Sequence, residues 1–169
     1  MQILFLCTGN SCRSALAEAI FNNLAPTGWS AVSAGSQPVG YIHPSAITIL
    51  QQHHINTVGL FSKSWDDLKS SPDIVITVCA SAAGETCPIY LGKAIRSHWG
   101  LTDPAKARGT EQEIAAVFEQ TFNQLKQAIT FFLQQPLDGL SNDKLQKLLN
   151  DVGQHFFNEN ILIVDGVIK

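Results

Sequence analysis

A cysteine and an arginine separated by five residues stand out near the start of the chain. Cys7 follows an apolar run at residues 2–6, and a helical pattern begins at Ser14. A short loop between a strand and a helix points successive backbone N–H groups inward and adds the helix dipole, which together make a nest for a tetrahedral oxyanion. We therefore predict an oxyanion-binding loop made of Thr8, Gly9, Asn10, Ser11, Cys12, Arg13 and Ser14.

The same loop would make Cys7 a nucleophile. Arg13 can hold two oxygens of an anion with its planar guanidinium, and the positive field of the loop is expected to lower the pKa of Cys7 and to supply thiolate near neutral pH. The alternative is a buried cysteine closing a strand and a surface arginine. An arginine in a first helical turn opposes the helix dipole, however, which argues for an anionic partner. A nucleotide-binding P-loop is disfavoured because the Gly-Lys-Ser/Thr ending is absent.

The elements that must position this loop alternate between strand and helix patterns. Such alternation predicts an α/β fold with a parallel sheet, right-handed crossovers and helices on both faces. Ligands of these sheets bind beyond the carboxyl ends of the strands, where Cys7 and Cys79 are both predicted to lie. We expect strands at 2–6, 29–33, 73–79 and 95–99, helices at 14–25, 43–54, 64–68, 111–134 and 142–152, and a strand-like end at 160–165.

Composition limits the class of protein. The 169 residues, 45% of them hydrophobic and 15% charged, fit one compact domain. A net charge of -3 gives no broad basic surface for nucleic acid or anionic lipid. The chain has neither an apolar run of the roughly 20 residues that span a membrane nor a leader pattern, so we expect a cytoplasmic protein. The cysteine spacing lacks the tight pairs of structural zinc sites, which favours chemistry for Cys7, Cys12, Cys79 and Cys87.

The segment Phe5–Ser14 resembles the signature of the low-molecular-weight tyrosine phosphatase superfamily, and in particular of its arsenate reductase branch. The resemblance covers about residues 2–153 and implies a three-layer sandwich with a central four-stranded parallel sheet flanked by helices. We accordingly expect a domain at 1–153 and a C-terminal extension of unknown packing at 154–169. Further matches lie at 33–36, 43–44, 62–63, 73–79, 87–88 and 98–104, of which Cys79, Cys87-Pro88 and His98-Trp99-Gly100 favour the reductase branch.

The resemblance also implies a reaction. Arsenate and phosphate have the same shape and charge, so one nest can bind either. Water releases a phosphocysteine, whereas a thiol-arsenate adduct is reduced to arsenite only when a second thiol attacks the first sulfur. In the family pattern Cys79 is that resolving thiol, and Cys87 then attacks to give a Cys79–Cys87 disulfide. The external reductant would be thioredoxin, or glutathione with glutaredoxin. The alternative for Cys79 and Cys87 is a core cysteine and a loop cysteine without a joint role.

Asp103, which precedes Pro104, matches the general acid of the family, although an ordinary Asp-Pro turn is the alternative. Ala105 stands where the phosphatases carry an aromatic residue that holds the substrate ring, which argues against phosphotyrosine as the main substrate. The favoured function is an arsenate reductase with Cys7, Arg13, Asp103, Cys79 and Cys87. The alternatives are a phosphatase that hydrolyses phosphate monoesters with the first three alone, and a catalytically idle oxyanion-binding module, which the intact set disfavours.

A metal and the remaining partners complete these expectations. Some reductases of this branch bind potassium near the loop, and Asn10, Glu18, Ser64 and Asp66 look like the corresponding positions. Glu18 and Asp66 also fit solvated or capping carboxylates, so we predict no metal. We expect no bound cofactor and a monomer whose partners are arsenate or phosphate and a thioredoxin or glutaredoxin, with neither nucleic acid nor membrane. The role of His98 is left open.

Overall fold

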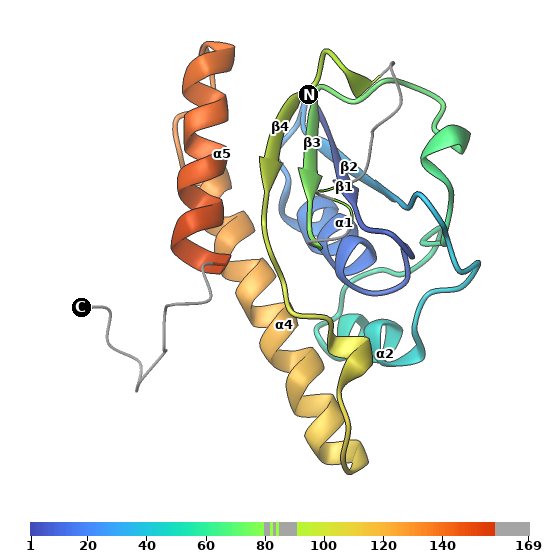
Figure 1. Ribbon diagram of the computed structural model, residues 1–169. Coiled ribbons are helices and arrows are strands. Elements are labelled where there is room, and N and C mark those ends of the chain that lie inside the picture. The colour runs from blue at the N-terminus through green and yellow to red at the C-terminus, as the bar shows by residue number, and fades with distance from the viewer. Residues whose placement is uncertain (80–81, 83, 85–90, 158–169) are drawn as a thin grey trace.

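A four-stranded parallel sheet forms the centre of the computed structural model, which describes residues 1–79, 82, 84 and 91–157 (Figure 1). Its strands are β1 (Gln2–Leu6), β2 (Ser30–Ala34), β3 (Ile74–Thr77) and β4 (Ile95–His98). The strand order is β2-β1-β3-β4, so β1 and β3 are central. The predicted parallel sheet is confirmed: β1 matches its expected range, β2 is shifted by one residue, and β3 and β4 are shorter than expected.

The register of the sheet brings the ends of its central strands together. Leu6, the last residue of β1, pairs with Ala34 of β2 and with Thr77 of β3. The N–H of Val78 donates to the carbonyl of Leu6 at 2.9 Å and extends the β1–β3 pairing beyond the strands. Because the strands are parallel, the residues that follow β1 and β3 emerge at the same edge of the sheet.

Helices flank the sheet, as expected for strands that are buried and nearly continuous in apolar side chains. α1 begins at Arg13, one position before the predicted Ser14, and α5 continues to Phe157, past the predicted end at residue 152. The domain boundary expected at residue 153 therefore falls inside α5. The strand-like segment predicted at 160–165 lies outside the described residues. The helices are α1 (Arg13–Leu24), α2 (Pro44–Gln52), α4 (Glu111–Leu133) and α5 (Asn142–Phe157), with short 3-10 turns η1 (Trp65–Asp67) and η3 (Pro104–Lys106).

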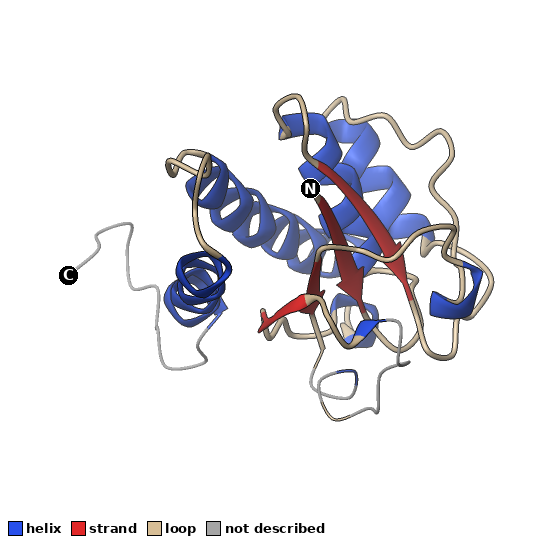
Figure 2. Cartoon of the chain, turned by 90° about the horizontal axis from the view of Figure 1, so that it is seen from above, coloured by secondary structure: helices blue, strands red, loops and turns tan. Residues whose placement is uncertain are grey.

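Aromatic packing joins these helices to the sheet. Phe5 of β1 lies between Phe21 of α1 and Trp99, with ring centroids 6.1 and 5.9 Å apart. Figures 1 and 2 show α5 beside the β4 edge of the sheet. Within the described ranges, no helix combines the length and the apolar character needed to cross a membrane.

Candidate active site

The carbonyl groups of the loop between β1 and α1 bond to a neighbouring segment. The carbonyls of Thr8, Gly9 and Ser11 accept hydrogen bonds from N–H groups of residues 37–43, at 2.9 to 3.0 Å. The N–H of Gly9 hydrogen-bonds to the Cys7 sulfur. The helix that follows has no acidic residue in its first turn and no side-chain cap on Cys12, so its N-terminal charge is left for an anion.

Asn10 fixes the shape of this loop. Its backbone is left-handed, with φ of 43°, a conformation that asparagine tolerates better than most residues. Its side chain is fully buried, and its amide nitrogen donates to Oγ of Ser14 and of Ser33, each at 2.9 Å. Its amide oxygen accepts from the N–H of Lys63 at 2.8 Å. Asn10 thus joins the loop to α1, β2 and the segment before η1.

Arg13 and Asp103 meet at the mouth of the loop. Nη2 of Arg13 lies 3.1 Å from Oδ2 of Asp103, and Nη1 donates to the carbonyl of Leu101 at 3.0 Å. Nε of Arg13 is buried and has no partner among the described residues, which leaves a donor for an oxyanion. Oδ1 of Asp103 accepts from the N–H of Ala105, so the Asp-Pro turn and the placement of the carboxylate beside the loop occur together. The two readings of Asp103 are therefore not exclusive.

The structure brings Cys7 and Cys79 into contact. Both thiols are free and buried, with 5% and 3% of their surfaces exposed, and they are hydrogen-bonded to each other. The N–H of Ala82 donates to the Cys79 sulfur at 3.4 Å, and Oγ1 of Thr8 lies 3.8 Å from it. A second thiol therefore lies next to Cys7. The third cysteine of the predicted relay, Cys87, lies outside the described residues.

The expected lowering of the Cys7 pKa is not what the structure produces. The hydrogen bond to Cys79 and burial raise the pKa of Cys7, and they outweigh the charge of Arg13 and the N–H of Gly9, which act in the expected direction. The hydrogen bond from Cys7, with those from Ala82 and Thr8, lowers the pKa of Cys79 to about 5 against the effect of burial. The hydrogen-bond donors gather at Cys79, which favours the thiolate there over a thiolate at Cys7.

Cys12 and His98 contribute differently from the cysteine pair. Burial and the charge of Asp103 raise the pKa of Cys12 to about 12, so this loop residue stays a thiol. His98 of β4 pairs with Thr77 of β3, and Nδ1 of the histidine is hydrogen-bonded to Oγ1 of the threonine at 2.8 Å.

Lys63 lies beside Glu18, one of the residues considered for a potassium site. Glu18 accepts a hydrogen bond from Ser33 and forms an ion pair with Nζ of Lys63 at 3.4 Å, and both charged side chains are largely buried. Ser64 and Asp66 hydrogen-bond to each other in the cap of η1. No cluster of three or more His, Cys, Asp or Glu side chains suited to a metal occurs in the described part of the chain.

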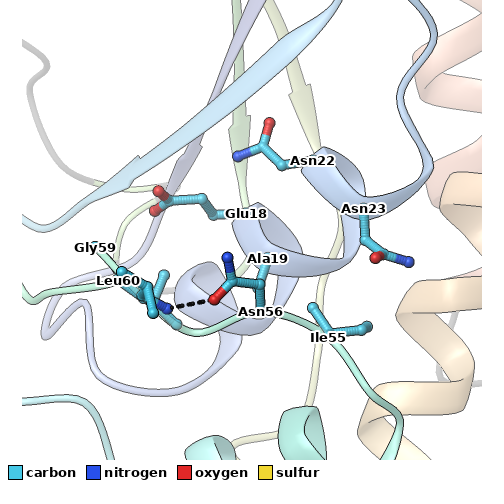
Figure 3. A pocket seen from close by; sticks show the side chains of 9 residues that line it. Glu18, Ala19, Asn22, Asn23, Ile55, Asn56, Gly59 and Leu60 are labelled. Carbon is cyan, nitrogen blue, oxygen red and sulfur yellow. Dashed lines mark hydrogen bonds between the residues drawn. The ribbon is translucent and has the colours of Figure 1, made fainter.

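A pocket of about 310 Å³ opens beside Glu18 of α1 (Figure 3). Asparagine side chains and the apolar residues Ile55 and Leu60 line the rest of it. Glu18 thus lines this pocket and also bonds to Ser33 and Lys63.

Ser33, Lys63 and Gly35 support the site without having been assigned a role from sequence. A side-chain carbon added at Gly35 would lie 2.4 Å from the carbonyl oxygen of Thr8, so a glycine is required where β2 approaches the loop. These residues belong to the segments 33–36 and 62–63, which carried the family resemblance. The matches were therefore the signal, although nothing local to them indicated a contact with Asn10.

Comparison with known proteins agrees with this geometry. Residues 2–146 match the family model of low molecular weight phosphotyrosine protein phosphatases. An arsenate reductase of Oceanobacillus iheyensis is 38% identical over 131 residues, which cover 77% of this chain and 93% of that protein. The structure of an arsenate reductase in the phosphate binding state has a TM-score of 0.60 at 25% identity, covering 77% of this chain and 97% of that one. A thioredoxin-dependent arsenate reductase of Corynebacterium glutamicum has a TM-score of 0.54 at 32% identity, covering 77% and 62%.

The chain therefore belongs to the low-molecular-weight phosphotyrosine protein phosphatase family, and within it to the arsenate reductases. The resemblance noted from the loop and from the later motifs is confirmed, as is the four-stranded fold that it implied.

Proposed function

We propose that the protein reduces arsenate to arsenite with Cys7 as nucleophile and Cys79 as resolving thiol. The contact between these two sulfurs beside an oxyanion loop is the observation that carries the proposal. A hydrolase needs a nucleophile, an anion nest and an acid, but no second thiol. A thiol hydrogen-bonded to the nucleophile is what a two-electron reduction through sulfur requires.

Arsenate would bind with its oxygens on the loop N–H groups and on Arg13. Attack by Cys7 forms a sulfur–arsenic bond, and the proton of the Cys7 thiol passes along the hydrogen bond to Cys79. The oxygen that leaves arsenic takes a proton from Asp103 and departs as water, since this carboxyl group lies beside Arg13 at the mouth of the loop.

Reduction follows when Cys79 attacks the Cys7 sulfur and gives the proton that it received to an oxygen of the departing arsenite. A sulfur–sulfur bond forms as the sulfur–arsenic bond breaks, and the electron pair of that bond stays on arsenic, which leaves as arsenite. Cys87 then exchanges with the Cys7–Cys79 disulfide to free Cys7. An external dithiol reduces the resulting Cys79–Cys87 disulfide. We propose thioredoxin for this step, supported by the similarity to a thioredoxin-dependent reductase; glutathione with glutaredoxin is the alternative.

Hydrolysis of phosphate monoesters by the same loop is the second candidate activity. It would use Cys7, Arg13 and Asp103 alone, and the family match supports it. Ala105, which is exposed beside Asp103, offers no aromatic surface for a phosphotyrosine ring. We therefore expect slow hydrolysis of simple aryl phosphates beside arsenate reduction.

Separate Cys79→Ser and Cys87→Ser variants test the proposal. Either change should abolish multiple turnovers of arsenate with thioredoxin while leaving aryl phosphate hydrolysis largely intact. Loss of the Cys79 thiol removes the contact that raises the Cys7 pKa, so the nucleophile survives. Cys87→Ser should also trap a Cys7–Cys79 disulfide after one arsenate, visible by mass spectrometry. Undiminished arsenate turnover in both variants would contradict the relay.

A further inference from the structure

The helix α5 occupies the open edge of the sheet. Among the residues that the structure describes, only β3 pairs with β4, so the outer edge of β4 would present free backbone groups. The side-chain amide of Gln146 bonds to both the N–H and the carbonyl of Arg96, and Oγ of Ser97 donates to Asn150 at 2.9 Å. Figure 1 shows α5 running along this edge. The family match ends at residue 146, so most of this helix lies beyond it.

Trp99, the residue that follows β4, packs against α5. This side chain is fully buried, and its indole N–H donates to the carbonyl of Leu149 at 3.1 Å. The ring of Phe157 stacks on it with centroids 5.4 Å apart. A carbon added at Gly153 would lie 2.6 Å from the carbonyl oxygen of His98 and 3.0 Å from Cδ1 of Trp99. The absence of a side chain at Gly153 therefore lets the helix and the strand approach this closely.

The segment that Trp99 anchors leads directly to the candidate acid. The N–H of Leu101 donates to the carbonyl of Val78 at 3.2 Å, and its carbonyl accepts from Nη1 of Arg13 at 3.0 Å. Two residues later, Asp103 lies 3.1 Å from Nη2 of the same arginine. Both contacts of the guanidinium therefore come from a short segment held at its start by α5.

We propose that α5 braces the active site, with Gly153 and Phe157 as positioning residues. Acting through Trp99, they hold the Leu101 carbonyl and the Asp103 carboxylate against Arg13. The inference rests on the proposed function for the roles of Asp103 and Arg13. The proposal gives a role in the reaction to residues of α5 that lie beyond the family match at residues 2–146.

Gly153→Ala in the full chain tests the brace. Alanine favours a helix over glycine, so helix propensity alone predicts a gain in stability, whereas the brace predicts a loss of acid catalysis. We expect kcat/KM to fall about tenfold for phenyl phosphate, whose leaving group needs a proton, and little for 4-nitrophenyl phosphate. Gln154→Ala, at an exposed position of the same helix, is the matched control and should leave both esters unaffected. Phe157→Leu is a milder second variant with the same expected selectivity.

A merely structural role would lower kcat/KM equally for both esters, and that result, or no loss at all, would overturn the brace. The NMR signals of the Arg13 Nε–H and the Leu101 amide give a readout without substrate. They should shift in Gly153→Ala and not in Gln154→Ala. If they shift while the wild type fails to reduce arsenate, the proposed function falls and the brace stands. If they do not shift in an active enzyme, the brace falls alone.

Discussion

Replacing Asn10 by alanine should destabilise the protein well beyond the loss of one side chain. The change removes three hydrogen bonds, buried ones to Ser14 and Ser33 and a partly buried one to Lys63, each worth about 1 kcal/mol. It also places alanine at φ of 43°, which costs about 1 kcal/mol more. We expect a loss of about 4 kcal/mol in the free energy of unfolding. Asn10→Gly should lose about 1 kcal/mol less, because glycine accepts the left-handed backbone.

Urea unfolding followed by tryptophan fluorescence measures these losses, and titration with inorganic phosphate measures the oxyanion affinity of each variant. A loop that must order on binding should hold phosphate about tenfold more weakly, since 1.4 kcal/mol of ordering corresponds to a factor of ten. Adding phosphate should then stabilise Asn10→Ala less than the wild type. Unfolding within 1 kcal/mol of the wild type together with unchanged phosphate affinity would refute the assignment of Asn10 as the residue that shapes the loop.

Three further substitutions address the charges of the site. Cys7→Ala should raise the pKa of Cys79 above about 5, because the hydrogen bond from Cys7 is the largest influence lowering it; an unchanged ultraviolet thiolate titration would contradict this. Arg13→Lys should lower kcat/KM roughly 100-fold, because an ammonium group cannot replace the planar guanidinium. Near-normal turnover would contradict the assignment of Arg13 as the residue that holds two oxygens of the anion. Lys63→Met should cost roughly 3 kcal/mol in urea unfolding by leaving Glu18 unpaired, and a further Glu18→Gln change should restore part of that loss.

The sequence was most informative where structure is set locally. The helix expected at 111–134 is observed at Glu111–Leu133, and its start is fixed by reciprocal hydrogen bonds between Thr110 and Glu113. The strand expected at 73–79 is shorter, at Ile74–Thr77. Its apolar residues continue past Thr77, where the register with β1 and β4 ends, so the pattern overstates the length of the strand.

Long-range contacts were the part that the sequence did not predict. The loop residues Cys7 to Ser14 are adjacent in the chain, so their spacing alone allowed a shared oxyanion site to be predicted. The ion pair between Glu18 and Lys63 joins residues 45 positions apart, and no local pattern indicates it. The Cys7 pKa was predicted in the wrong direction for the same reason. The local field of Arg13 was considered, whereas the contact with Cys79 exists only in the folded sheet.

The register between β1 and β3 decides whether an oxyanion loop can also be a reductase. Leu6 pairs with Thr77, so Cys79 lies level with the first residues of the loop and beside Thr8. A shift of one residue would turn the Cys79 side chain to the opposite face of the sheet and away from Cys7. The loop, the arginine and the acid would all remain, and with them the means to cleave a phosphate ester. In the proposed relay, the first resolving thiol is therefore placed by strand pairing, and no change in the oxyanion nest is needed.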